Sequence, residues 1–248
     1  MFTHTIDPAI LHLGPLEIRW YGLMYVLAFF VTYYYVRSAI RQGKLKLTEK
    51  ELDSMLGWMV VCMILGARLF YAFFYNPTYF MDAPWKILFV WEGGLSFHGG
   101  LVGVAFAAWW YGTRKKGIPF SHLADLFCVP IALGNAFGRI GNFINGELYG
   151  VVTNLPWGVV FPGAEGARHP TQLYEAAYNV VIFGILYSMR NKDWKDGTLF
   201  GVYLILYGIF RFGVEFIKDL PSYGPLTMGQ WLTLPVFLIG IWLVWRNK

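Results

Sequence analysis

The run from Gly138 to Gly150, GRIGNFINGELYG, combines residue types that suit the binding of an anion. It places Arg139, Asn142 and Glu147 among four glycines. A guanidinium, amide donors and accessible backbone N–H groups together favour an anionic headgroup. The alternative is that Arg139 snorkels to a membrane interface while the glycines form a turn. The asparagine and glutamate companions favour the binding site, since snorkelling does not require them.

A second arginine lies in a pattern that points to the same chemistry. Tyr207, Arg211 and Glu215 are spaced by four residues each, so they share one face of a helix. A structural Arg211–Glu215 ion pair would account for two of them. Two arginines on one side of the protein instead favour a clamp for a phosphate group.

His98, which is followed by two glycines, is a candidate general base. A neutral imidazole accepts a proton near pH 7, and the glycines allow a substrate to approach the backbone. The alternative is a hydrogen-bonded packing residue. Glu147 and Glu215 are rival candidates for the same role.

Other reaction classes lack their characteristic residues. The five histidines show no metal-binding spacing such as HxxxH or HExxH, and no GxSxG motif presents a serine. Cys62 and Cys128 both lie in apolar runs, where a thiol is not activated. We therefore expect no metal, no cofactor and no covalent enzyme intermediate.

The elements that position these residues are membrane helices, as the composition indicates. Of 248 residues 56% are hydrophobic and 14% are charged, and the mean hydropathy is +0.46. Too few charges are available to solvate a soluble surface, so an ordinary cytosolic enzyme is excluded. The 11 Trp and 16 Tyr suit the two interfaces of a bilayer. The predicted fold class is an all-α, polytopic integral membrane protein.

Stretches between charged residues predict seven transmembrane helices within a single domain, 1–248. They cover about 20–36, 55–75, 93–113, 123–138, 171–189, 198–216 and 226–245. The second contains Arg68, for which the sequence shows no evident partner. The residues from about 147 to 170, rich in glycine and proline, are expected to form a small outward-facing cap.

The distribution of basic residues predicts the orientation. Thirteen of the 20 Lys and Arg residues lie after the first, third, fifth and seventh helices, at 37–50, 114–116, 190–195 and 246–248. Basic loops remain on the cytoplasmic side, so the N-terminus is expected outside and the C-terminus in the cytoplasm. Topology then explains the net charge of +5, and a nucleic-acid partner has no separate support.

Local signals predict helix contacts and one helix start. Small residues four apart allow close approach of helices, as in the pairs Gly99/Gly103, Gly134/Gly138 and Gly197/Gly201. His169 and Thr171 flank Pro170 and are expected to cap the fifth helix.

Four segments together resemble the bacterial prolipoprotein diacylglyceryl transferases. They are GRIGNFINGELYG, HGGLVG from His98, HPTQLYEA from His169 and FRFGVEF from Phe210. Val102, where the family pattern has isoleucine, is a conservative departure. The resemblance spans most of the chain and implies a multi-pass protein of the bacterial cytoplasmic (inner) membrane, with its active site toward the outer leaflet.

The resemblance also implies the reaction. The diacylglyceryl group of phosphatidylglycerol moves to the lipobox cysteine of an exported prolipoprotein, and glycerol phosphate is released, as the first step of lipoprotein maturation. The partners are then phosphatidylglycerol, the prolipoprotein signal peptide and membrane lipid. Because the acceptor thiol belongs to the substrate, no activated cysteine is needed in the enzyme.

The family motifs imply the following roles. Arg139 and Arg211 bind the phosphate, and Asn142, Glu147 and Gly150 shape the headgroup site. Residue type and position, rather than the family motifs, make His98 the first candidate for the base, with Glu215 or Glu147 as rivals, and Tyr21 and Tyr207 are expected to bind or orient substrate.

Two other classes of protein remain as alternatives. Arginines within membrane helices can line the pathway of an anion or lipid-headgroup transporter, or serve a passive lipid-binding scaffold. The sequence has no inverted repeat, and its polar residues cluster at the predicted outer ends, which disfavours transport.

Overall fold

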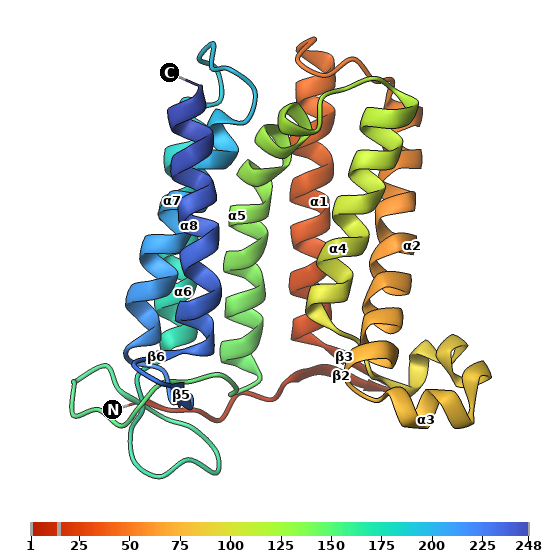
Figure 1. Ribbon diagram of the computed structural model, residues 1–248. Coiled ribbons are helices and arrows are strands. Elements are labelled where there is room, and N and C mark those ends of the chain that lie inside the picture. The colour runs from red at the N-terminus through yellow and green to blue at the C-terminus, as the bar shows by residue number, and fades with distance from the viewer. Residues whose placement is uncertain (1, 14–15, 248) are drawn as a thin grey trace. The chain divides into compact units, whose positions relative to one another are not determined.

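The computed structural model describes residues 2–13 and 16–247 and is mostly helical (Figure 1). The chain forms two compact units. Residues up to Val36 and from Ala124 onward form the first unit, and Arg37–Leu123 form the second.

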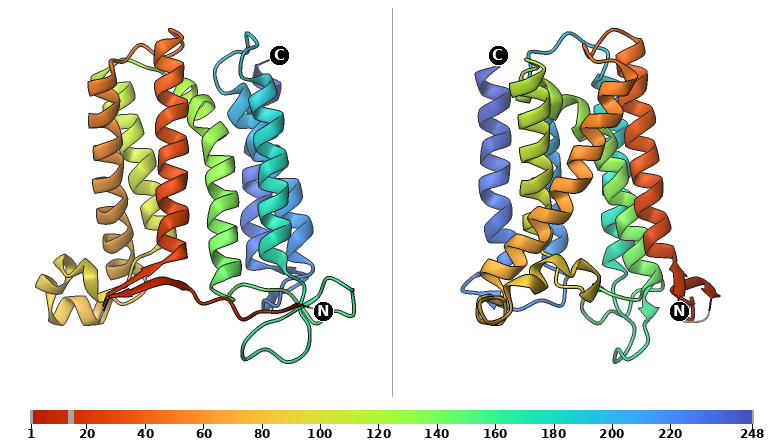
Figure 2. Two further views of the ribbon diagram at one scale, coloured as in Figure 1. Left: turned by 180° about the vertical axis from the view of Figure 1, so that it is seen from behind. Right: turned by 90° about the vertical axis from the view of Figure 1, so that its right-hand side faces the viewer.

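The first unit is built on long helices, of which α5 to α8 run side by side (Figure 2). The helices are α1 (Trp20–Arg41) up to Val36, α5 (Phe120–Ile144) from Ala124, α6 (Thr171–Met189), α7 (Thr198–Glu215) and α8 (Met228–Arg246). Residues of α5, α6 and α7 form its apolar core, including Val129, Ala132, Ile182 and Leu186, each with no exposed surface. This core holds the helices whose ends carry the candidate site.

Small residues bring these helices together. A Cβ atom on Gly201 of α7 would lie 3.0 Å from the carbonyl oxygen of Gly240 in α8, which confirms a close contact at Gly201. A Cβ on Gly134 would lie 3.2 Å from that of Ala28 in α1. The packing prediction is wrong for Gly138, since a Cβ there would meet no described atom within 4 Å.

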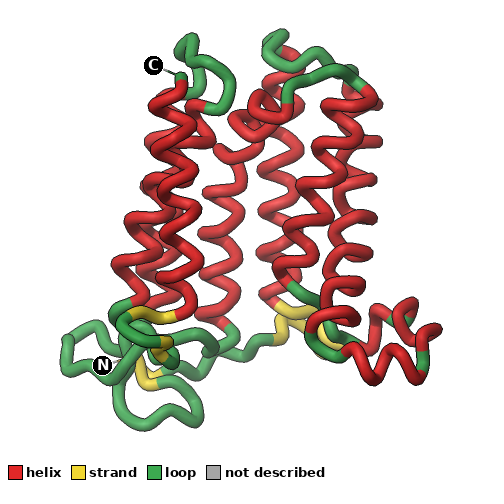
Figure 3. The backbone as a smooth tube through the Cα atoms, viewed as in Figure 1, coloured by secondary structure: helices red, strands yellow, loops and turns green. Residues whose placement is uncertain are grey.

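Short strand pairs lie at the helix ends of this unit. β1 (Phe2–Thr3) runs parallel to β4 (Val159–Val160), whereas β2 (Ala9–Leu13) with β3 (Leu16–Arg19) and β5 (Ser222–Tyr223) with β6 (Leu226–Thr227) are antiparallel. Most of the chain between α5 and α6 is loop (Figure 3). An isolated bridge from Gly150 to Lys218 joins this loop to the chain just after α7.

The second unit contains α2 (Glu49–Phe74), α3 (Pro77–Asp82), the 3₁₀ turns η1 (Pro84–Leu88) and η2 (Val90–Glu92), and α4 (Phe97–Ala107), which continues as the π-helix η3 (Ala108–Lys115). Thr48 and Glu51 form a capping box that starts α2. Close packing of α2 on α4 needs glycine, because a Cβ on Gly103 would lie 2.0 Å from the carbonyl oxygen of Cys62. The small-residue prediction is confirmed here.

Arg68 has partners that the sequence does not reveal. The side chain is buried, and its guanidinium donates to backbone carbonyl oxygens of Lys86 (2.6 Å), Ile87 (3.0 Å), Phe89 (3.0 Å), Gly93 and Gly94 (3.3 Å). It therefore ties the 3₁₀ turns to α2.

The predicted helix bounds agree best for α6 and α7, which differ from 171–189 and 198–216 by one residue at most. The fourth predicted helix, 123–138, is too short. Helix α5 continues through Arg139 and Asn142 to Ile144, so the first half of the glycine-rich run belongs to this helix. Gly141 continues the helical hydrogen bonding, and the chain leaves the helical conformation by Gly146, which has a φ of 69°.

Five helices within the described residues are long and apolar enough to cross a membrane: α1, α2, α5, α7 and α8. Together with the helical content, these segments make the chain an all-α, multi-pass membrane protein.

Candidate active site

The end of α5 presents the first candidate residues. Arg139 and Asn142 are one turn apart, and Arg139 Nη1 donates to Asn142 Oδ1 over 3.4 Å. The Asn142 amide in turn donates to Glu147 Oε1 at 2.8 Å, and Asn145 donates to the same oxygen at 3.1 Å. The candidate residues of the glycine-rich run, Arg139, Asn142 and Glu147, are thus joined in one polar network.

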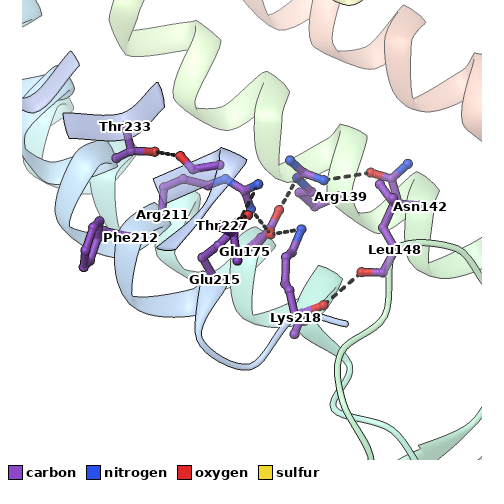
Figure 4. Close-up of polar contacts among 12 residues, drawn as sticks. Arg139, Asn142, Leu148, Glu175, Arg211, Phe212, Glu215, Lys218, Thr227 and Thr233 are labelled. Carbon is purple, nitrogen blue, oxygen red and sulfur yellow. Dashed lines mark hydrogen bonds and ion pairs between the residues drawn. The ribbon is translucent and has the colours of Figure 1, made fainter. Parts of the chain in front are cut away.

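Glu175, near the start of α6, is the centre of the ionic contacts (Figure 4). Its side chain has no exposed surface. Oε1 lies 2.8 Å from Arg211 Nη1 and 2.6 Å from Lys218 Nζ, and Oε2 pairs with Arg139 Nε. One buried carboxylate therefore links two arginines and a lysine from three parts of the chain.

Glu215 holds the other side of the Arg211 guanidinium. Its Oε2 lies 2.8 Å from Arg211 Nη2, and its Oε1 accepts from the hydroxyl of Thr227 at 2.9 Å. The side chain is 1% exposed. The i, i+4 ion pair, which was the alternative to a phosphate clamp in the sequence, is present, and Arg211 is oriented by two carboxylates rather than one.

These five side chains, Arg139, Glu175, Arg211, Glu215 and Lys218, are called the Glu175 cluster below. Three cations and two carboxylates give it a formal charge of +1. A buried charge that is not balanced costs free energy, so the cluster favours the arrival of one negative charge. Burial lowers the pKa of the Lys218 ammonium, and the neighbouring Glu175 carboxylate opposes that shift.

The loop after α5 is fixed by the start of α6. Gln172 Nε2 donates to the carbonyl oxygen of Glu147 at 2.6 Å, and the Thr171 hydroxyl donates to that of Leu148 at 2.9 Å. Leu148 has a φ of 62°, a left-handed conformation that is unfavourable for leucine. Thr171 therefore fastens a strained loop, and the prediction that it caps α6 is wrong.

His169 does not cap α6 either. The residue before the helix is Pro170, and no side chain caps that end. The His169 ring nitrogen Nδ1 instead lies 3.2 Å from the hydroxyl of Tyr174. The capping prediction failed because tertiary contacts compete for both polar side chains.

Gly150 allows two segments to approach closely. A Cβ there would lie 2.3 Å from the carbonyl oxygen of Ile217, so any side chain would push the loop away from the residues that follow α7. Next to this contact is a cavity of about 450 Å³, lined by Gly146 to Tyr149 and by Lys218 to Leu220. Gly150 thus keeps the loop against the segment that carries Lys218.

The two predicted tyrosines lie on helices of the same unit. The Tyr21 ring packs against Gly141 of α5, and its hydroxyl lies 3.0 Å from that of Tyr25. The Tyr207 ring neighbours those of Tyr178 and Tyr203, with centroids 6.4 and 5.9 Å away.

His98 belongs to the second unit. It is the second residue of α4, its side chain is exposed, and its ring centroid lies 6.5 Å from that of Phe70. Its role as a base stays a prediction.

Sequence reasoning missed two members of the cluster. Glu175 lies within the HPTQLYEA segment, and an acidic residue inside a predicted membrane helix was the signal that could have identified it. Lys218 was counted only as a loop charge. Its burial depends on how the loop after α5 folds, so the local sequence carries no sign of it.

Comparisons with known proteins show the family of the chain. The family model described as prolipoprotein diacylglyceryl transferase matches residues 8–246. Relatives named phosphatidylglycerol–prolipoprotein diacylglyceryl transferase include one from Geobacter sulfurreducens, 47% identical over 97% of this chain and 94% of the relative. Those from Bordetella avium (45% identical, 95% and 92% covered) and Nitratidesulfovibrio vulgaris strain DP4 (43% identical, 96% and 94% covered) are similar over comparable lengths. The chain therefore belongs to the prolipoprotein diacylglyceryl transferase family.

Proposed function

We propose that this protein transfers the diacylglyceryl group of phosphatidylglycerol to the thiol of a prolipoprotein cysteine and releases glycerol phosphate. The observation that carries this proposal is the buried Glu175 cluster with its formal charge of +1, in a chain that belongs to this family. A phosphodiester carries one negative charge, so the headgroup of phosphatidylglycerol balances the cluster.

The reaction forms a carbon–sulfur bond and breaks a carbon–oxygen bond. The thiol sulfur attacks the sp³ carbon of the diacylglyceryl group, and the phosphate oxygen leaves with the bonding electron pair. The thiol proton passes to a base, for which His98, Glu147 and Glu215 are the candidates. Free thiols have a pKa of about 8.5, so the base assists at neutral pH.

Arg139 and Arg211 stabilise the leaving group in this proposal. Each guanidinium has five N–H donors, and the contacts with Glu175 and Glu215 leave others for phosphate oxygens. Their side chains are 24% and 16% exposed, whereas the two carboxylates are buried, so the arginines are the members that a ligand can reach. One positioned donor of this kind contributes about 10²- to 10³-fold in rate.

Asn142, Glu147 and Gly150 shape the headgroup site in this proposal, and Tyr21 and Tyr207 orient the substrates. The Asn142 amide bridges Arg139 and Glu147, which supports a role in orienting the arginine. Gly150 supports the site by the close approach to Ile217 described above.

The membrane arrangement is part of the proposal. α4 with η3 and α6 also cross the bilayer, which gives seven helices in one transferase domain, 1–248, with residues 147–170 as an outer cap. The N-terminus lies outside the cytoplasmic membrane, the C-terminus lies in the cytoplasm, and the site faces the outer leaflet. In support, Arg139 lies near the end of α5, Glu175 near the start of α6, and the basic residues from Arg190 follow the opposite end of α6.

The test uses purified protein in phosphatidylglycerol vesicles with a peptide whose apolar run ends in a lipobox cysteine. We expect mass spectrometry to detect a diacylglyceryl mass gain on this peptide, none on a cysteine-to-serine peptide, and none in vesicles of phosphatidylcholine alone. Protein that binds phosphatidylglycerol but leaves the cysteine peptide unchanged would contradict the proposal.

A further inference from the structure

Lys218 is a buried cation beside the two arginines of the cluster. Its side chain is 5% exposed, and its Nζ lies 2.6 Å from Glu175 Oε1. The residue follows the end of α7, and the bridge with Gly150 fixes its backbone. The position of this ammonium is therefore determined by the fold.

Glu175 competes with any phosphate for the arginines. It pairs with Arg139 through Oε2 and with Arg211 through Oε1, and the Arg211 contact is a hydrogen bond from Nη1. A phosphodiester that binds the remaining N–H donors of these arginines attracts both guanidiniums and weakens their pairing with the carboxylate. A buried carboxylate that loses its cations is costly, so the exchange needs another cation that stays with Glu175.

Lys218 is in position to be that cation, and it also sets the charge of the cluster. With Lys218 the five groups carry +1, and without it Arg139 and Arg211 only balance Glu175 and Glu215. A monoanionic phosphodiester would then bring an unbalanced negative charge to a buried site.

We propose that Lys218 is a positioning residue for the phosphodiester of phosphatidylglycerol, which it assists by holding Glu175 while Arg139 and Arg211 turn to the phosphate. The inference rests on the proposed function of the site. Lys218 acts through Glu175, so its loss weakens lipid binding more than it slows the chemical step.

The test compares Lys218→Met, Lys218→Arg, Glu175→Gln and the double variant Glu175→Gln/Lys218→Met with the wild type. KM for phosphatidylglycerol and kcat come from transfer assays, and the dissociation constant of a fluorescent phosphatidylglycerol analogue provides a binding readout. Lys192→Met, an exposed lysine after the other end of α6, is the matched control.

We expect Lys218→Met to raise KM and the dissociation constant about tenfold or more. Its kcat, and all constants of Lys218→Arg and Lys192→Met, should stay within about threefold of wild type. The double variant returns the cluster to +1, because Arg139, Arg211 and Glu215 are then its only charged members. Its KM should therefore fall back toward the wild-type value, which a purely structural role of Lys218 would not produce.

Unchanged lipid binding in Lys218→Met overturns the inference. A double variant whose increase in KM equals the product of the increases in the two single variants also overturns it. If Lys218→Met does not fold, the double variant alone tests the inference. A KM for phosphatidylglycerol about tenfold above the wild-type value would contradict the claim that the charge of the cluster sets lipid binding. A wild type that transfers nothing refutes the proposed function instead, and the dissociation constants still test Lys218.

Discussion

Gly229→Ala should disturb the active site without changing any charged residue. A Cβ on Gly229 would lie 2.1 Å from Glu215 Oε1, 2.7 Å from its Cδ and 3.0 Å from its Oε2. The carboxylate has to move, yet it is 1% exposed and is held by Arg211 and Thr227. The substitution therefore separates Glu215 from Arg211.

The size of the effect follows from the contact that is lost. The contact is a buried ion pair, for which we take about 1.5 to 3 kcal/mol, the lower part of the range for close charge pairs; each 1.36 kcal/mol is a factor of ten in rate. If Arg211 must hold its orientation to stabilise the leaving phosphate, kcat/KM should fall roughly 10- to 150-fold.

The assay is diacylglyceryl transfer in phosphatidylglycerol vesicles, with kcat/KM measured for Gly229→Ala and for Gly184→Ala. Gly184 lies in α6, where a Cβ would meet no described atom within 4 Å, so its variant should retain wild-type activity. Thermal unfolding in detergent establishes that both variants are folded. Wild-type kcat/KM in Gly229→Ala would refute the reasoning that Glu215 orients Arg211.

Three further predictions concern stability, measured as free energies of unfolding in mixed detergent. Asp125→Ala removes two 2.7 Å hydrogen bonds to N–H groups at the start of α7 and should cost about 2 kcal/mol; an unchanged value would contradict a capping role. Gly103→Val forces α4 away from the Cys62 carbonyl oxygen of α2 and should cost about 3 kcal/mol, so a wild-type value would disprove the close contact. Leu148→Gly relieves the left-handed backbone and should stabilise the protein by about 1 kcal/mol, whereas a loss of stability would show that the leucine side chain matters more than its φ.

The sequence predicted features that depend on local composition. Runs of mainly apolar residues locate α6 and α7 to within a residue, although Glu175, Arg211 and Glu215 lie inside these helices. The i, i+4 spacing of Arg211 and Glu215 also suffices for their ion pair. The bounds of α5 were less predictable, since Gly141 is compatible with a helix as well as with a turn.

Features that depend on tertiary contacts were not predictable in this way. Arg68 binds backbone carbonyl oxygens, which any residue type can supply, so no partner can be recognised in the sequence. In the sequence Lys218 resembles an ordinary loop lysine. Its burial arises only in the folded chain, where it bridges to Gly150 in the loop after α5. Glu175 pairs with Arg211 and Lys218, which lie 36 and 43 residues later in the sequence, so no local spacing relates them.

The most direct test of the central claim counts both products of one reaction. Wild-type protein and the Arg139→Gln, Arg211→Gln and Arg190→Gln variants are incubated with phosphatidylglycerol vesicles and the cysteine peptide, and modified peptide and glycerol phosphate are quantified together. We predict one glycerol phosphate for each modified peptide, a rate about 100-fold lower in the Arg139 and Arg211 variants, and no change in Arg190→Gln, which alters an arginine directly after α6. Peptide modification at the wild-type rate in the Arg139 and Arg211 variants would contradict the claim that these arginines bind the phosphate.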